Sequence, residues 1–302
     1  MKRARSLTEP DRPSVVVEVR QTTLGIASLD SGGRLGSAAA LELPEGTLRL
    51  SLTEPNILDR SAFRRVLAMA IERTGLKGRR SVGLVLPDPV ARLVLLAASE
   101  LQMPGTSFPD LLRFRLKKTV PFDVQEAQIA SLSGGEGQPI LVGAVARPVL
   151  RDYEEALASE GFEAGLVELS GLALAEAALG AHGDELLVNW EPGYLSFLLF
   201  RSGFPILVRT LTGPAAEAES VGQEASQTYL YYRERLSGEA LGRAFVRCSE
   251  SQSKEAILGL ERAFAVPFAR LDPWAFVGGG PPELAQDTGL AGALASLRRA
   301  QA

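Results

Sequence analysis

The chain has 302 residues, enough for two domains at the usual ~100–200 residues each and long enough to bury a large core. With 46% hydrophobic and 23% charged residues, the composition excludes wholesale disorder, collagen-like repeats and a disulfide scaffold. The 32 Lys and Arg residues stand against 36 Asp and Glu residues, a net charge of −4, so we expect no nucleic-acid partner.

The rare residues and the hydropathy pattern limit the compartment and the metal chemistry. Cys248 is the only cysteine and His182 the only histidine, which excludes an intramolecular disulfide and a metal site built from several histidines. Residues 1–13 are polar and contain prolines, so we expect a flexible leader and no signal peptide. No run approaches the ~18 apolar residues of a membrane span. We therefore expect a cytoplasmic protein that reaches a membrane only through partners.

The first half opens with three strands and a helix. β-Branched and alternating apolar residues predict the strands, and a 3.6-residue apolar period, with a start near Asp59 and an exit at Gly75, predicts the helix. The predicted strands are residues 15–19, 23–29 and 37–43, and the helix is residues 58–74.

The pattern changes after residue 80 into a smaller α+β unit. Its predicted strands are residues 81–86, 91–97, 126–131 and 139–146, and its helices are residues 108–119 and 148–160. A short strand at 165–168 and a helix at 171–179 follow.

The second half repeats the order of the first. Three strands, 185–190, 194–200 and 204–212, precede a long helix at 215–236. A strand at 243–248, a helix at 253–264, a strand at 266–271 and a helix at 290–299 complete the chain. We expect an α/β fold of two duplicated lobes with a cleft between them. Residues 14–79 and 161–183 would form the first lobe, residues 80–160 an inserted α+β subdomain, and residues 184–302 the second lobe.

Several local strings resemble the PilM family of type IV pilus assembly proteins, relatives of actin and of the division protein FtsA. They are Val-Gly-Leu-Val-Leu-Pro-Asp at 82–88, the helix that ends in Val-Pro-Phe-Asp at 120–123, Gly-Phe-Pro at 203–205 followed by Arg-Thr at 209–210, and Asp-Pro-Trp at 272–274. The resemblance implies an actin-like, ribonuclease H-like fold of two lobes. It also implies a role at the cytoplasmic face of the inner membrane, where PilM proteins hold the N-terminal tail of the bitopic partner PilN.

The first nucleotide loop of this family is altered here. The family string Asp-Ile-Gly corresponds to Glu18, Val19 and Arg20, followed by Thr22 and Thr23. Glutamate could still hold Mg²⁺ and the threonines could donate to phosphate, but arginine replaces the glycine that lets backbone N–H groups approach.

The other two nucleotide contacts are altered further. The second Asp-Ile-Gly corresponds to Asn189, Trp190 and Glu191, which removes the acid and adds a carboxylate that repels phosphate. The Gly-Gly of the adenosine loop corresponds to Cys248 and Ser249. We expect no cofactor and no ATP turnover. Under the alternative of a weak Mg-ATP-binding ATPase, Glu18, Thr22, Thr23, Asn189 and Ser249 would be the contacts.

Other residues leave two interpretations open. The basic residues 113, 115, 117 and 118 predict either a patch for a partner tail or lipid headgroups, or a solvated helix end. Tyr229 and Tyr232 share a helix face and could fill the cleft or pack on the sheet. The glycines at 134–137 and 278–280 are interpreted as loops, His182 as a helix-end or surface residue, and Cys248 as packed. We assign no catalytic residue and no metal ligand.

The sequence thus predicts a PilM-like scaffold of a type IV pilus or related secretion machine, with self-association left open. The family resemblance places the groove for the PilN-like tail in the neighbourhood of Val120, Pro121 and Phe122, and Phe122→Ala is the first substitution to consider. A GspL-like component of type II secretion is a further alternative.

Overall fold

Two sheets of identical topology organise the molecule. The computed structural model describes residues 12–78, 80–101, 105–134, 138–180, 183–248, 254–279 and 288–301. One five-stranded sheet has the order β3-β2-β1-β4-β8 and the other β11-β10-β9-β12-β13. In both, an antiparallel three-stranded meander is extended by two parallel strands. The predicted duplication is therefore confirmed.

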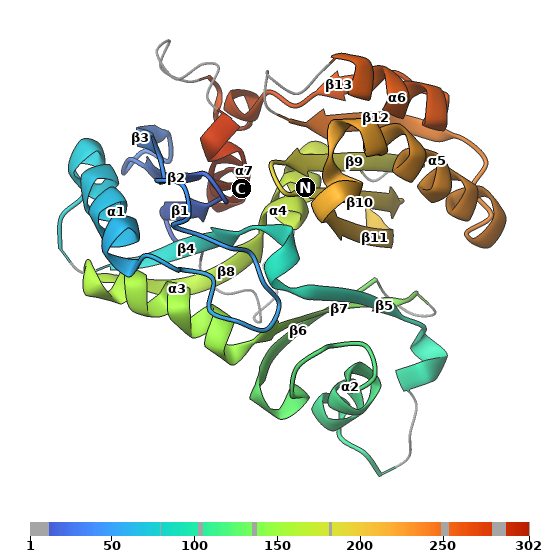
Figure 1. Ribbon diagram of the computed structural model, residues 1–302, viewed down its shortest axis with the longest axis horizontal. Coiled ribbons are helices and arrows are strands. Elements are labelled where there is room, and N and C mark those ends of the chain that lie inside the picture. The colour runs from blue at the N-terminus through green and yellow to red at the C-terminus, as the bar shows by residue number, and fades with distance from the viewer. Residues whose placement is uncertain are drawn as a thin grey trace.

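The central strand of the first sheet is buried on both faces. Its strands are β1 (Val15–Val19), β2 (Thr23–Leu29), β3 (Leu35–Glu42), β4 (Arg80–Leu86) and β8 (Phe162–Leu169). Every residue of β1 is buried, which explains its unbroken β-branched run. Helices α1 (Arg60–Thr74) and α3 (Arg147–Ser159) cover one face (Figure 1). The predicted ends of α1 are confirmed: the Asp59 side chain accepts from Ala62 N, and Gly75 ends the helix at φ 66°.

The second sheet carries helices on one side and faces the first lobe with the other. Its strands are β9 (Asp184–Glu191), β10 (Tyr194–Arg201), β11 (Phe204–Thr212), β12 (Leu241–Arg247) and β13 (Phe268–Arg270). Helices α5 (Ala218–Arg235) and α6 (Lys254–Phe264) pack on the outer face. Helices α4 (Ser170–Ala178) and α7 (Ala291–Gln301) fill the layer between the sheets (Figure 1).

The inserted subdomain is smaller than the sequence division. Its sheet has the order β5 (Arg92–Leu96), β7 (Ile140–Ala146) and β6 (Ala127–Ser133), and it packs on α2 (Phe108–Leu116). The sequence division gives residues 80–160 to this unit. However, β4 pairs with β1, and α3 buries its apolar face in the first-lobe core.

The C-terminal helix contacts both lobes, whereas the division predicted from the sequence gives residues 184–302 to the second lobe alone. Helix α7 packs Ala293, Leu294 and Leu297 against Val16 and Val85 of the first sheet. Ala291 and Ala295 of the same helix contact α4 and the second sheet. A helix that is apolar on two sides can be buried between two layers. Its local sequence then does not show to which lobe it belongs.

The hydropathy of the described helices agrees with the expectation that no segment spans a membrane. No described helix is both long and apolar enough to cross a membrane.

Asp184 gives a test of how the second lobe is held together. Its carboxylate accepts from Arg201 Nε at 2.8 Å and Nη2 at 2.7 Å, and from the Tyr232 hydroxyl at 2.7 Å. The hydrogen bond from Arg201 lowers the pKa of Asp184 below its ordinary value of 3.8. The carboxylate therefore stabilises the fold above that value and loses this contribution as pH falls through the lowered pKa.

We expect Asp184→Asn to reduce the free energy of unfolding by about 1–2 kcal/mol at pH 7, because it removes the charge from a hydrogen-bond network. The deficit should shrink at pH 3. Urea unfolding at both pH values measures it, with the exposed Glu234→Gln of α5 as control. An equal deficit at the two pH values would contradict the assignment.

Candidate functional site between the two lobes

Strand alternation points the same two positions of each lobe into the layer between the lobes. Val15, Val17 and Val19 face α1 and α3, so Glu18, which alternates with them, faces the other way. In β9, Val188 and Trp190 face the outer core, which leaves Asn189 and Glu191 on the inner face. By the duplication, Glu18 is equivalent to Asn189, and Arg20 to Glu191.

Arg20 and Glu191 join the lobes in a buried ion pair. Arg20 Nε and Nη2 lie 2.7 and 2.5 Å from Glu191 Oε2. The two residues are only 6% and 1% exposed, so water screens the pair little. Two equivalent positions of a duplicated hairpin thus carry opposite charges that pair across the interface.

Arg247 extends the pair into a cluster, hereafter the interlobe cluster of Glu18, Arg20, Glu191 and Arg247. Arg247 ends β12 directly opposite Asn189 in the parallel ladder. It forms ion pairs with Glu191 and, at 3.6 Å, with Glu18 Oε1. Burial, followed by the charge of Arg20, lowers the pKa of Arg247 to about 9. That value still leaves Arg247 positively charged at neutral pH.

Glu18 ties the cluster to the C-terminal helix. Its Oε2 accepts from Ala293 N at 3.0 Å, at the N-terminal end of α7, where the helix dipole favours a carboxylate. A Cβ on Gly292 would come within 3.0 Å of Glu18 Oε1, so glycine allows this approach. Burial raises the pKa of Glu18, while Arg247, Arg20 and the α7 amides act in the opposite direction.

A second polar contact across the lobes surrounds Asp88, which follows β4. Its carboxylate accepts from Gly171 N at 2.7 Å, at the start of α4, and from Asn189 Nδ2 at 2.9 Å. Asn189 Oδ1 in turn accepts from Arg247 Nη1 at 3.2 Å, which links this contact to the interlobe cluster. Burial raises the pKa of Asp88, because the donors around it only partly replace water.

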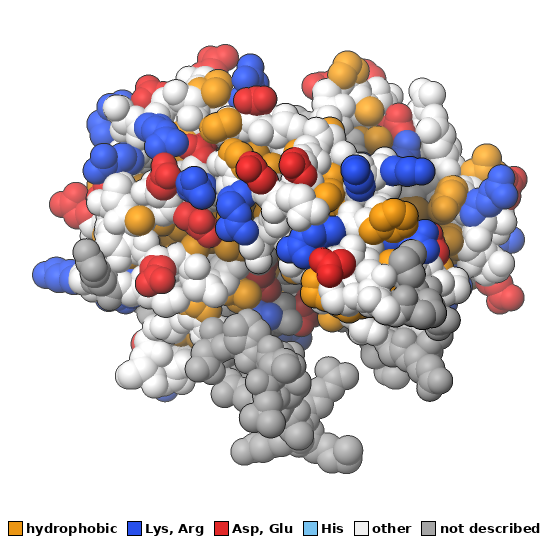
Figure 2. All heavy atoms as spheres, turned by 90° about the horizontal axis from the view of Figure 1, so that it is seen from below, with side chains coloured by type: hydrophobic (Ala, Val, Ile, Leu, Met, Phe, Trp, Pro, Cys, Tyr) orange, Lys and Arg blue, Asp and Glu red, His pale blue; other side chains and the backbone are white. Residues whose placement is uncertain are grey.

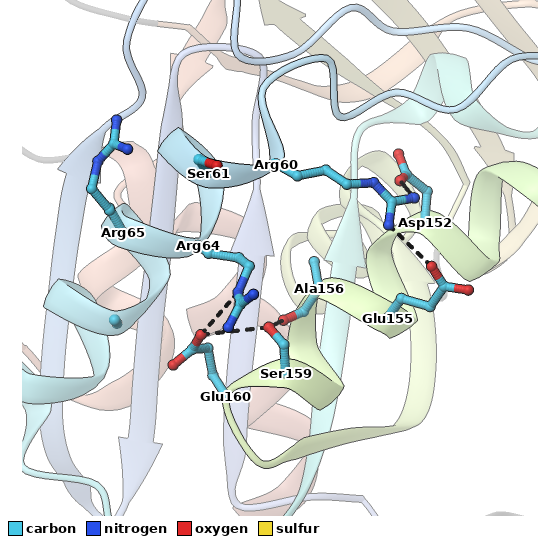
Figure 3. A pocket seen from close by; sticks show the side chains of 10 residues that line it. Arg60, Ser61, Arg64, Arg65, Asp152, Glu155, Ala156, Ser159 and Glu160 are labelled. Atoms are coloured by element: carbon cyan, nitrogen blue, oxygen red, sulfur yellow. Dashed lines mark hydrogen bonds and ion pairs between the residues drawn. The ribbon is translucent and has the colours of Figure 1, made fainter.

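An open groove lies elsewhere, between α1 and α3. Its volume is about 490 Å³, and Arg60, Arg64, Arg65, Asp152, Glu155 and Glu160 line it (Figure 3). Arg60 pairs with Asp152 and Glu155, and Arg64 with Glu160. Figure 3 shows these side chains reaching from one helix to the other, while Arg65 points away from them.

The groove continues to the inserted subdomain. An adjoining hollow of about 370 Å³ shares Arg60, Asp152 and Glu155 and adds Gln125, Glu126, Arg147 and Arg151. Seen from the side of the insert, the surface of the first lobe shows blue and red side chains interleaved (Figure 2). We call the two hollows together the α1–α3 groove.

Comparison with known proteins places the fold. No protein-family model matches the chain, and no curated protein sequence matches it. A solved structure described as the PilM-PilN type IV pilus biogenesis complex superposes with a TM-score of 0.79 at 16% identity, covering 97% of this chain and 100% of that chain. The chain has an actin-like fold of two lobes.

Two further structures share this fold at lower similarity. A Bacteroides thetaiotaomicron protein with an actin-like ATPase fold and unknown function gives a TM-score of 0.52 at 10% identity, covering 96% of this chain and 98% of that chain. The cytoplasmic domain of EpsL, an inner-membrane component of the type II secretion system of Vibrio cholerae, gives 0.50 at 16% identity, with coverages of 82% and 93%.

The structure brings together only some of the predicted nucleotide residues. Glu18 and Asn189 both contact Arg247. Thr22, by contrast, is exposed in the bend after β1, and Thr23 is the half-buried first residue of β2. Ser249 lies outside the described residues, as does His182.

Two residues of the site were missed by the sequence reasoning, Arg247 and Asp88. The available signals were a charged residue directly after the apolar run 244–246 and the acid in the turn after β4.

Neither Trp190 nor the two tyrosines of α5 named above lies between the lobes. Trp190 packs in the outer core of the second lobe and donates from Nε1 to Ala216 O at 2.9 Å. Tyr229 and Tyr232 pack against each other and against the same core, as the packing interpretation predicts. The aromatic residue at the interlobe cluster is Tyr194 of β10, which is 1% exposed and accepts from Asn189 Nδ2 at 3.3 Å.

The residues present do not fit a Mg-nucleotide. The two positions where an actin-like ATPase would need glycine carry Arg20 and Glu191, bonded to each other and buried. A triphosphate would have to break this pair and then face the carboxyl groups of Glu18 and Glu191. The interlobe cluster is therefore suited to holding the lobes together and not to binding phosphate.

The expected partner residues lie at the junction of insert and first lobe. Val120 and Phe122 are half-buried against the α2 cluster, and Phe122 also packs on the first-lobe core, while Pro121 is exposed. Phe122→Ala would therefore weaken packing on two clusters, which makes it a poor probe of binding.

A double-mutant cycle tests the interlobe cluster. Glu191→Met leaves Arg20 and Arg247 short of a buried counter-charge, and we expect it to reduce the free energy of unfolding by about 3–5 kcal/mol. The double variant Arg20→Met/Glu191→Met should cost less than the sum of its single changes, because they act on one interaction. Urea unfolding at pH 7 measures all four proteins.

Arg64→Ala serves as the control, since its pair with Glu160 is 54% and 22% exposed and should contribute less than about 1 kcal/mol. If Glu191→Met costs no more than Arg64→Ala, the cluster does not hold the lobes.

Proposed function

We propose that this protein is a scaffold of a type IV pilus or related secretion assembly platform at the cytoplasmic face of the inner membrane. It binds the cytoplasmic tail of a PilN-like membrane partner and does not turn over ATP. The observation that carries the proposal is the buried Arg20–Glu191 pair at the equivalent positions of the two hairpins, within a fold shared with PilM. The likeness to the EpsL cytoplasmic domain supports the broader class of secretion-platform components.

Loss of nucleotide chemistry follows from the electrostatics of the interlobe cluster. In an ATPase of this fold the nucleotide and its metal bring together charges from both lobes. Here Arg20, Arg247, Glu18 and Glu191 already neutralise one another without a ligand. A nucleotide would gain little from replacing them and would leave buried charges without partners.

The α1–α3 groove is the surface proposed for the partner tail. Its second hollow is lined by Gln125 and Glu126, a few residues after Phe122, near which the family resemblance places the groove. The two hollows share three lining residues and so form one continuous surface. Within the described part of the chain, no carboxylate forms an ion pair with Arg65 or Arg151, and both are exposed. An extended tail with acidic groups could pair with Arg151 within the groove and with Arg65 at its α1 edge.

Mg-ATP provides the first test. We expect no change in the melting temperature of the wild-type protein in 5 mM Mg-ATP, because the interlobe cluster leaves no place for the phosphates. The assay is sensitive enough, since a ligand at 100 times its Kd would add ~2.7 kcal/mol to the free energy of unfolding. A saturable rise in melting temperature would instead support the weak ATPase.

Binding of a labelled peptide of the partner's cytoplasmic tail provides the second test of the proposed function. By fluorescence anisotropy, we expect Arg65→Glu/Arg151→Glu to weaken binding by more than tenfold, because a hydrogen bond to a charged group contributes about 1.5–3 kcal/mol. Arg73→Glu/Lys77→Glu makes the same charge change at exposed positions near the end of α1 and should bind like wild type. Equal affinity of both variants would remove the groove from the proposal.

A further inference from the structure

The outward face of α2 combines an aromatic ring with basic side chains. Leu111, Leu112 and Leu116 bury the inner face of this helix against the insert sheet. On the opposite side Phe114 is 60% exposed, which is unusual for a large aromatic side chain on a surface helix.

Helical spacing surrounds Phe114 with cations. The helical turn continues past Leu116, since Lys117 N bonds to Arg113 O and Val120 N to Leu116 O. Lys117 and Lys118 therefore lie three and four residues from Phe114, on its side of the helix, and both are exposed. The Arg115 guanidinium lies 5.9 Å from the ring centroid.

The charge of this face opposes that of the whole protein. Arg113, Arg115, Lys117 and Lys118 bring four positive charges within six residues, against one acid, Asp110, on the same helix. The chain as a whole carries −4. A local positive patch on an acidic protein orients it toward an anionic surface and is not a by-product of a basic composition.

The position of α2 leaves this face open to a flat surface. The helix lies at the end of the insert that is farthest from both five-stranded sheets (Figure 1). Viewed from that side, the molecule shows hydrophobic side chains beside Lys and Arg (Figure 2). A projecting ring with cations around it suits a soft, laterally continuous layer, whereas a folded protein partner would need a pocket shaped to receive Phe114.

We propose that the outward face of α2 binds an anionic phospholipid surface, with Phe114 entering the headgroup layer and Lys117 and Lys118 pairing with lipid phosphates. This contact goes beyond the proposed function, because it gives the protein a direct hold on the membrane that needs no partner. It also replaces the expectation that the membrane is reached only through partners.

Sedimentation of the full chain with vesicles tests the contact. We expect binding to vesicles of phosphatidylglycerol and phosphatidylcholine at 0.1 M salt and none to pure phosphatidylcholine. Lys117→Glu/Lys118→Glu should weaken binding by at least about 25-fold, at about fivefold for each cation removed from an anionic surface. Phe114→Ala should weaken it several-fold, and higher salt should weaken it for every protein that binds.

Charge-matched and folding controls separate the outcomes. Arg73→Glu/Lys77→Glu should sediment like wild type, and unchanged melting temperatures will show that the exposed substitutions leave the fold intact. Wild type that stays in the supernatant, or α2 variants that sediment as well as wild type, overturn the proposal. The proposal is also overturned if the protein binds immobilised poly-glutamate through Lys117 and Lys118 but does not bind vesicles, because the basic face would then recognise an acidic polypeptide. Failure of Arg65→Glu/Arg151→Glu to affect tail binding would leave this result untouched, since the two surfaces are separate.

Discussion

The buried ion pair between Arg20 and Glu191 is the constraint on which the rest of the structure depends. It joins two hairpins that lie 171 residues apart in the chain, and it does so where both lobes turn toward each other. Arg247 and Glu18 complete the charge balance, and Glu18 also receives an amide of α7. The same few side chains therefore fix the lobes and the C-terminal helix in one arrangement.

Such a cluster contributes more to geometry than to net stability. Moving four charged groups out of water costs about as much as their attraction returns, so an apolar interface could be equally stable. Charges, however, must meet their partners within a few tenths of an ångström, whereas apolar side chains tolerate sliding. A scaffold whose binding surfaces lie on different parts of the molecule benefits from a fixed relation between them, and the Asp88–Asn189 contact reinforces it.

The two proposed binding surfaces differ in the side chains that they present. The α1–α3 groove alternates acids and arginines, many of them paired, which suits an extended polypeptide of defined sequence. The α2 face carries an exposed ring and unbalanced positive charge, which suits a fluid anionic layer. Phe122 packs at the junction between the insert that bears α2 and the lobe that bears the groove, so it couples their positions.

The sequence by itself determined the parts that depend on neighbours in the chain. The runs that form β1 and β2, the cap at Asp59 and the left-handed exit at Gly75 are local, and the repeated strand order exposed the duplication. It also flagged Arg20 and Glu191 as wrong for a phosphate loop, but not that they pair with each other. That pairing, the part played by Arg247 and the burial of α7 between the lobes were decided only by the tertiary structure. Each depends on contacts between residues distant in sequence. The local pattern is equally compatible with other long-range contacts, and their energies differ only once both sheets are packed.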